Sequence, residues 1–112
     1  MSKVDEKIAF YKQEAKTQGI VLNEGLLEKV TKALGPSIHS NDASKVSTSD
    51  PEEVGRVKQS FLVGKLGLKD GPELDTAIKE VANKFGASNK NKHRAIFYTL
   101  LVEKFHKEDL YK

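Results

Sequence analysis

The sequence predicts an all-α fold, a single compact domain of about five helices over residues 1–112. An N-terminal helical hairpin is expected to pack on a three-helix C-terminal unit. Two observations predict this architecture. Apolar residues recur in five segments at the spacing of a helix with one buried face. Each segment is bordered by residues that start or stop helices, and no segment offers a convincing partner strand for a sheet.

The N-terminal hairpin is expected to end before residue 36. Ser2 resembles the start of a capping box, and apolar residues then recur at helical spacing as far as Gly19. Asn23 is the expected N-cap of the second helix. That helix has a strong stop at Gly35-Pro36, because glycine adopts the left-handed conformation that ends helices and proline cannot continue them.

The three helices of the C-terminal unit have similar start and stop signals. Asp50-Pro51 supplies a cap and a proline for the third helix, and Gly67 is its expected left-handed cap. Asp70-Gly71-Pro72 restarts the chain into a fourth helix, which stops at Gly86. Ser88 is the expected N-cap of the fifth helix.

The fifth helix is apolar on almost every side over residues 95–102, so it is expected in the middle of the core. A strand over the same residues is the alternative, since aromatic and β-branched residues also suit a sheet. Homo-oligomerisation through this helix is a further open alternative. The C-terminal unit is expected to pack around Phe61, Phe85 and Phe97.

A Ser-rich segment at residues 36–49 connects the hairpin to the C-terminal unit. It is too long for an ordinary connector between helices. One interpretation is structural, a single turn that begins at Asp42, with Ile38 and Val46 packed down as anchors. The other interpretation is functional, a binding loop or a phosphorylated segment, in which an added phosphate would lie near helix ends and lysines.

The chain contains no cysteine, which excludes a disulfide framework, a thiolate nucleophile and a cysteine-ligated metal site. This composition suits a reducing cytosol, so a cytoplasmic location is expected. The N-terminal residues lack the apolar stretch of a signal peptide. The longest apolar run lies within residues 95–102 and is far shorter than the roughly 20 residues that span a bilayer, so no membrane span is expected.

The net charge of +3 lies entirely in the second half of the chain, because lysines and acidic residues balance over residues 1–50. Residues 81–102 contain no Asp or Glu and four cations, Lys84, Lys90, Lys92 and Arg94. The last three lie near the expected start of the fifth helix, where positive charge opposes the helix dipole. A bound anion would relieve this repulsion.

The sequence therefore predicts an anion-binding or nucleic-acid-binding site formed by Ser88, Lys90, Lys92 and Arg94. The hydroxyl would cap the helix, and the cations would contact phosphate or carboxylate oxygens. The leading hypothesis is a non-enzymatic binding or interaction module with a basic surface at the start of the last helix. An acidic protein or a nucleic acid is the expected partner.

The alternative hypothesis is a helix-turn-helix-like nucleic-acid-binding protein that uses residues 78–101. Ala82, Gly86 and Ser88 fit the small residue, the turn glycine and the following helix start of such a motif. The basic second helix would then contact bases and phosphates. Lys92 conflicts with this hypothesis, because a recognition helix usually has an apolar residue at that position, packed on its partner helix.

The chain is not expected to be an enzyme, and no cofactor or metal is expected, because no catalytic motif has workable spacing. Glu103 and His106 form a Glu-x-x-His pair, but a di-iron bundle needs a second such pair and two further glutamates. His39, Ser40 and Asp42 have the side-chain types of a hydrolase triad, but neighbours on a connecting segment do not establish a hydrogen-bonded relay.

A family resemblance runs through nearly the whole chain without gaps. Its residues are 29–31, 34–38, 42–44, 57–58, 61–62, 65–68, 70–75 and 91–98. In these positions the chain resembles a bacterial family of small uncharacterised proteins, domain of unknown function 2853 (DUF2853). The resemblance implies a small cytosolic bacterial protein. Because the family has no assigned activity, the resemblance supplies no catalytic residue.

Overall fold

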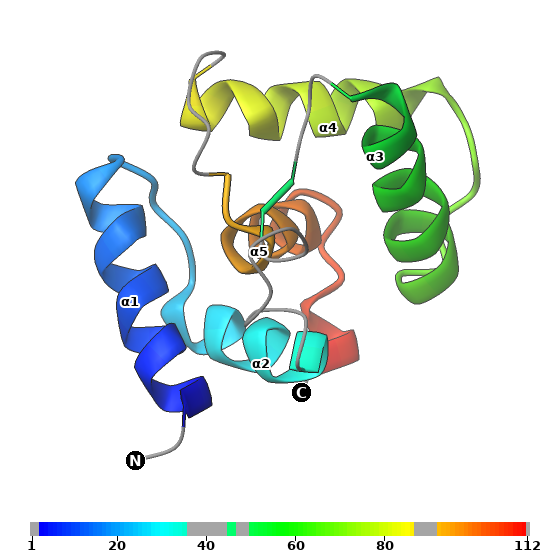
Figure 1. The fold of residues 1–112 in the computed structure, drawn as a ribbon. Coiled ribbons are helices and arrows are strands. Elements are labelled where there is room, and N and C mark those ends of the chain that lie inside the picture. The colour runs from blue at the N-terminus through cyan, green and yellow to red at the C-terminus, as the bar shows by residue number, and fades with distance from the viewer. Residues whose placement is uncertain (1–2, 36–44, 47–49, 87–91, 112) are drawn as a thin grey trace.

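Helices form most of the described chain, as the amphipathic segments predict (Figure 1). The computed structural model describes residues 3–35, 45–46, 50–86 and 92–111. Its helical elements are α1 (Lys3–Thr17), α2 (Glu24–Leu34), α3 (Pro51–Arg56), the π-helix η2 (Val57–Lys65), α4 (Pro72–Phe85), α5 (Arg94–Lys104) and the 3-10 helix η3 (Glu108–Tyr111). Among these residues there is no strand, only an isolated antiparallel bridge between Lys45 and His93. The predicted all-α class is confirmed.

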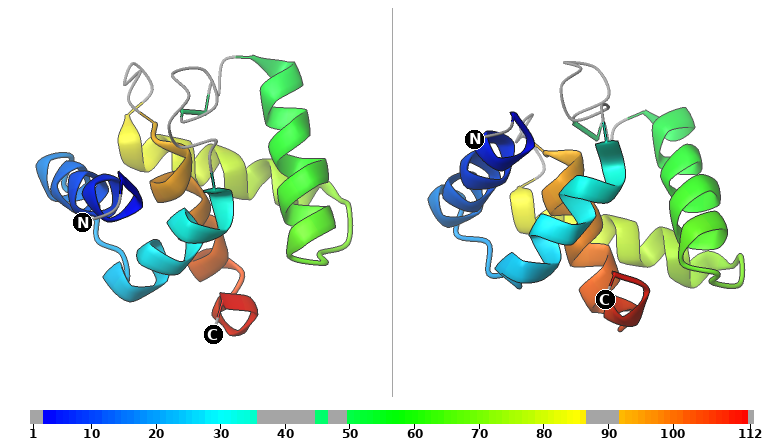
Figure 2. Two further views of the ribbon diagram at one scale, coloured as in Figure 1. Left: turned by 60° about the horizontal axis from the view of Figure 1, so that its bottom comes forward. Right: turned by 90° about the horizontal axis from the view of Figure 1, so that it is seen from below.

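Helix α5 runs through the centre of the molecule, and the other helices surround it (Figures 1 and 2). The α1–α2 hairpin packs against α5, α4 packs against it as well, and η2 contacts α4. Every residue from Ala95 to Val102 is buried. A helix that is apolar all round is stable only inside a core, so its central position follows from its composition. The helix was the correct prediction for this segment, and the strand alternative is wrong.

The N-terminal hairpin is fixed at the turn between its two helices. Asn23 caps α2 as predicted, because its Oδ1 accepts a hydrogen bond of 3.0 Å from the amide of Leu26. The amide of Asn23 donates to Oε1 of Glu103 at 2.9 Å, which ties this turn to α5. Gly35 follows α2 with a φ of 64°, in the left-handed region that ends helices.

The third predicted helix is a single helical segment over residues 51–65, in which α3 continues into η2. The sequence did not predict that its second part would be π-helical. Gly64 lies in this part, where an added Cβ would come within 3.2 Å of the carbonyl oxygen of Gln59. The wider turn therefore explains a glycine that is unfavourable inside an ordinary helix. Beyond the segment, Gly67 has the left-handed conformation expected of it, with a φ of 69°.

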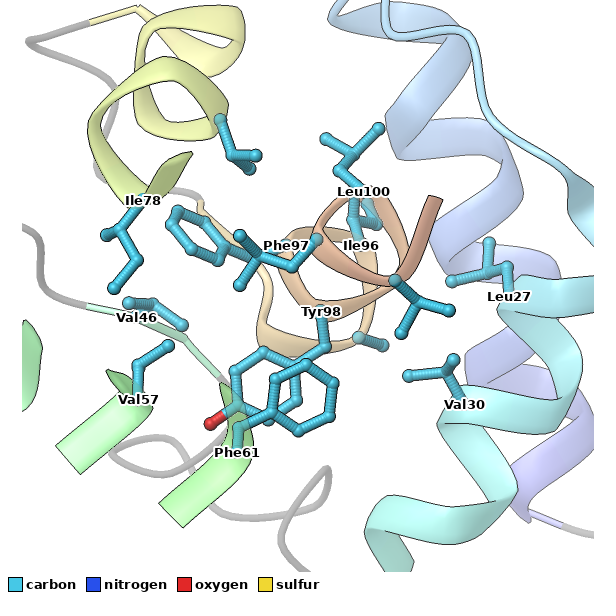
Figure 3. Close-up of a cluster of buried hydrophobic side chains, with 14 of the residues drawn as sticks. Leu27, Val30, Val46, Val57, Phe61, Ile78, Ile96, Phe97, Tyr98 and Leu100 are labelled. Atoms are coloured by element: carbon cyan, nitrogen blue, oxygen red, sulfur yellow. The ribbon is translucent and has the colours of Figure 1, made fainter. Parts of the chain in front are cut away.

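The core lies on both sides of α5 (Figure 3). On one side Phe97 stacks on Phe85 of α4, with ring centroids 5.9 Å apart. The ring of Phe61 of η2 stacks on that of Tyr98, with centroids 3.8 Å apart. On the other side Leu27 of α2 is fully buried against the same helix. The three phenylalanines predicted at the centre of the C-terminal unit are all buried.

Helix α5 begins at Arg94, later than the predicted start after Ser88. His93 has an extended backbone and forms the antiparallel bridge, and the amide of Val46 donates to the carbonyl of Lys92 at 2.8 Å. Backbone groups engaged in this pairing are not available to a helix, so the helix starts only beyond them. The N-cap is therefore His93, whose side chain makes no capping hydrogen bond. Ser88 lies outside the described residues.

The Ser-rich connecting segment is described at residues 45–46 alone. Val46 is buried in the main core, as the structural interpretation of the segment predicts. Ile38 and Asp42 lie outside the described residues. A binding or phosphorylation role for the rest of the segment stays a prediction.

Asp50 provides a direct test of the predicted helix start. Its Oδ1 accepts a hydrogen bond of 3.0 Å from the amide of Glu52, which would otherwise lack a partner in the first turn of α3. We expect Asp50→Ala to lower the free energy of unfolding by about 1 kcal/mol, measured by urea denaturation. Asp50→Asn is the matched control and should stay close to wild type, because asparagine caps as well as aspartate. Equal losses in both variants would contradict the capping role.

Candidate anion-binding site at the start of α5

The predicted anion-binding residues differ in how the structure presents them. Ser88 and Lys90 lie outside the described residues. Lys92 is only 5% exposed, and the side chain of Arg94 is 15% exposed. Neither of these two described cations therefore presents a fully open side chain to a partner.

Arg94 is held in a network that joins α5 to α3. Its Nη2 donates to Oε1 of Glu53 at 2.6 Å, and its Nη1 donates to the hydroxyl of Tyr98 at 2.5 Å. Nη2 also reaches the carbonyl of Lys45 at 3.5 Å. Burial raises the pKa of Tyr98 above its ordinary value, although Arg94 opposes this effect, so the hydroxyl is neutral and accepts the hydrogen bond. The guanidinium thus contributes to the fold as well as to the local positive charge.

The side chain of His93 lies between α1 and the start of α5. Its ring contacts Phe10 edge-on, with centroids 5.2 Å apart, and Tyr11 at 5.3 Å. Its Nε2 is 3.5 Å from Oε1 of Glu14. Neither this nitrogen nor the buried hydroxyl of Tyr11 has a hydrogen-bond partner among the described residues. A histidine that the sequence left without a role is therefore a buried polar group at a helix interface.

The electrostatic surroundings of His93 favour its neutral form. Burial is the largest effect and lowers the pKa of the imidazole below 6.5, while Glu14 raises it. Lys45 and Lys7 both lower it further. The ammonium of Lys7 lies 5.6 Å from the centroid of the Phe10 ring, which itself packs on the imidazole. Sequence analysis missed both lysines, because they come from segments far from residue 93 and neither has a distinctive local pattern.

We define the cationic cluster as Lys7, Lys45, Lys92 and Arg94. Two carboxylates lie at this site. Oε1 of Glu53 is 2.6 Å from Nη2 of Arg94, and Oε1 of Glu14 is 3.5 Å from Nε2 of the neighbouring His93. The cluster brings together α1, the bridge segment and the start of α5, so its charge density is higher than the net charge of the chain indicates.

The helix-turn-helix alternative requires an exposed second helix, and α5 does not provide one. Its residues 95–102 are all buried within the chain itself. A recognition helix must enter the major groove of DNA with side chains free to contact base edges. The position of α5 therefore argues against this use of residues 78–101. Because residues 95–102 are buried in this way, they cannot serve as an apolar contact face for a second copy of the chain.

Among the described residues, the catalytic and metal-binding candidates of the sequence are Glu103 and His106. Glu103 accepts the hydrogen bond from the amide of Asn23, and His106 is exposed at the end of α5. No group of three or more His, Cys, Asp or Glu residues that could hold a metal occurs in the described part of the chain. His39, Ser40 and Asp42 lie outside it. None of the helices described is long and apolar enough to cross a membrane.

A surface hollow lies between α4 and the end of α5. It has a volume of about 410 Å³, and its lining includes Thr76, Glu80, Lys104 and Phe105. The carboxylate of Glu80 forms an ion pair with the ammonium of Lys104. This pair neutralises the charges of Glu80 and Lys104, and Glu73 is a second carboxylate in the lining.

The comparison with known families agrees with the resemblance carried by the residues. Residues 10–109 match the family described as protein of unknown function (DUF2853). The matched range contains α2 to α5 and most of α1. Among curated proteins, no sequence matches the chain. Since the family match covers most of its length, the chain belongs to the DUF2853 family.

Proposed function

We propose that this protein is a non-enzymatic cytoplasmic binding module that contacts an anionic partner through the basic surface at the start of α5. The observation that supports this most is the cationic cluster. It includes Lys7 and Lys45, which both act electrostatically on His93, and Arg94, which reaches the carbonyl of Lys45. A concentration of like charge costs folding free energy, and an anionic partner would reduce that cost.

The lysines of the surface have different roles in this proposal. Lys45 is exposed and Lys7 is partly exposed, so both can make direct contacts. Lys90 and Ser88, predicted from the sequence, lie outside the described residues and belong to the proposed surface by prediction alone. Buried charges contribute through the field that attracts the partner rather than through contact. Arg94 and Lys92 belong to this second group.

An acidic protein segment is the partner class that the fold favours. Duplex DNA is usually contacted through a helix or ribbon that fits a groove, and α5 is enclosed by its own chain. A patch of lysines with a modest charge excess suits carboxylates arranged on a protein surface. The binding experiment below distinguishes an acidic protein from a nucleic acid as the partner.

The test compares binding of a labelled glutamate-rich peptide and a labelled duplex DNA by fluorescence anisotropy. The variant Lys7→Gln/Lys45→Gln/Lys90→Gln removes the contacting lysines and leaves Arg94 in place. We expect it to bind the peptide about tenfold more weakly at low salt, since three contacts of roughly half a kcal/mol each give that factor. The binding of wild type should also weaken between about 50 and 200 mM salt.

The matched control neutralises three exposed lysines outside the cluster, Lys29, Lys69 and Lys79, and should bind the peptide as wild type does. If neither ligand binds at low salt, or if both triple variants lose binding equally, the proposed surface is wrong. Binding of duplex DNA in preference to the peptide would replace the acidic protein by nucleic acid as the partner class.

A further inference from the structure

We propose that His93 makes the packing of α1 on the start of α5 sensitive to pH. In this proposal α1 is docked while the imidazole is neutral, and protonation of the ring loosens it. The inference concerns a device within the fold and does not depend on the identity of any partner.

The geometry places His93 where a change in its charge acts on α1. The residue is 5% exposed, and its ring packs on Phe10 and Tyr11, which both belong to α1. Tyr11 is buried in the main core, so this contact joins α1 to the rest of the molecule. Helix α1 lies at the edge of the fold, beside α2 and the start of α5 (Figures 1 and 2). It can therefore separate without opening the α4 side of the core.

The charged groups around the ring oppose a positive charge on it. From α1, Glu14 attracts a proton to the ring at 3.5 Å, whereas Lys7 repels it. From the bridge segment, Lys45 repels it as well. On the segment of His93 itself, Lys92 and Arg94 add two further cations. Glu53 pairs with Arg94, so Glu14 is the described carboxylate that contacts the ring. Protonation would thus place a buried positive charge on a ring whose pKa Lys7 and Lys45 already lower.

The direction of the pH effect follows from proton linkage. Burial, with Lys45 and Lys7, lowers the pKa of His93 in the docked state below 6.5, although Glu14 opposes this. When α1 separates, the ring returns to water and to an ordinary pKa of about 6.5. The undocked state therefore binds the proton more tightly. Docking is at full strength above pH 6.5 and weakens as the pH falls from there through the pKa of the docked state.

The size of the effect is set by the difference between the two pKa values. Each unit of difference lowers the docking equilibrium constant by about tenfold once the pH has fallen below both values. Two measurements on the intact chain report this change. Proton NMR gives the pKa of His93, and hydrogen exchange, corrected for intrinsic rates, gives the protection of α1 relative to α4.

Three variants isolate the role of His93. His93→Phe keeps an aromatic ring between Phe10 and Tyr11 and removes the titration. Glu14→Gln keeps the imidazole and removes its only described carboxylate contact, so it should lower the pKa of His93 further. His106→Asn is the control, because His106 is exposed at a φ of 55°, a conformation that asparagine tolerates.

The expected results separate α1 from the rest of the fold. Between about pH 7.5 and pH 5, wild type and His106→Asn should lose protection in α1 more than in α4. In His93→Phe the protection of α1 relative to α4 should be the same at both pH values. Glu14→Gln should lose more protection in α1 than wild type does. A pKa of His93 at or above 6.5, equal losses in α1 and α4, or a wild-type response in His93→Phe would each overturn the proposal.

Discussion

Phe97→Ala is expected to lower the free energy of unfolding by about 4 kcal/mol, the largest effect of any single change considered for this protein. The side chain is fully buried on α5 and stacks on Phe85. Removing the ring loses the favourable free energy of transferring it from water into the core. It also leaves a cavity at the point where α4 meets the central helix. Surrounding helices held by their own contacts can relax only in part, so the cavity persists.

Urea denaturation followed by circular dichroism measures this loss as a lower transition midpoint with an unchanged slope. Phe10→Ala deletes the same atoms from a side chain that is 37% exposed on α1. It should cost about 1 kcal/mol, because much of its ring is already in contact with water. If the two substitutions cost the same, α5 is not the centre of the core.

The central position of α5 could be predicted because it depends on composition alone. Residues 95–102 have almost no polar side, so any stable arrangement must cover them all round. The helix boundaries at Asn23 and Asp50 could be predicted for a similar reason. A cap is a contact between residues two or three positions apart, and that information is contained in the local sequence.

The start of α5 could not be predicted, because it depends on residues distant in the chain. Ser88 has the side chain of an N-cap, yet His93 is extended and the carbonyl of Lys92 accepts a hydrogen bond from the amide of Val46. Their backbone groups pair with residues 45–46, and no pattern near Ser88 reports that pairing. A local signal was overridden by a long-range hydrogen bond.

The anion-binding site at the start of the last helix stays a prediction. Local charge indicated the start of the last helix, and the structure adds Lys7 and Lys45 to that region. It also shows that a cation can be part of the scaffold. Sequence analysis counted Arg94 among the contacts for a partner, whereas Glu53 already holds its guanidinium. A count of charges along the sequence shows that Arg94 is positive. It does not show that Glu53, on a different helix, neutralises that charge.

This difference makes Glu53 the site of the second large effect. Both side chains of the pair are only 15% exposed, and Nη2 of Arg94 is 2.6 Å from Oε1 of Glu53. Glu53→Ala removes the carboxylate and leaves a mostly buried guanidinium beside Lys45. We expect a loss of about 3 kcal/mol in the free energy of unfolding, at the lower end of the range for a broken buried pair because some solvent reaches it.

Glu80→Ala provides the matched control, because it breaks the ion pair between Glu80 and Lys104. The side chain of Glu80 is 52% exposed, and that of Lys104 is 37% exposed. An exposed pair contributes about 0 to 1 kcal/mol, so urea denaturation should show a much smaller loss there. The double variant Glu53→Leu/Arg94→Met should recover most of the stability, since it leaves neither charge buried alone. Equal losses in the two single variants would mean that Arg94 is not held by the fold. Its guanidinium would then be as available to an anionic partner as the lysines of the surface, and the division between scaffold and contact residues would have to be abandoned.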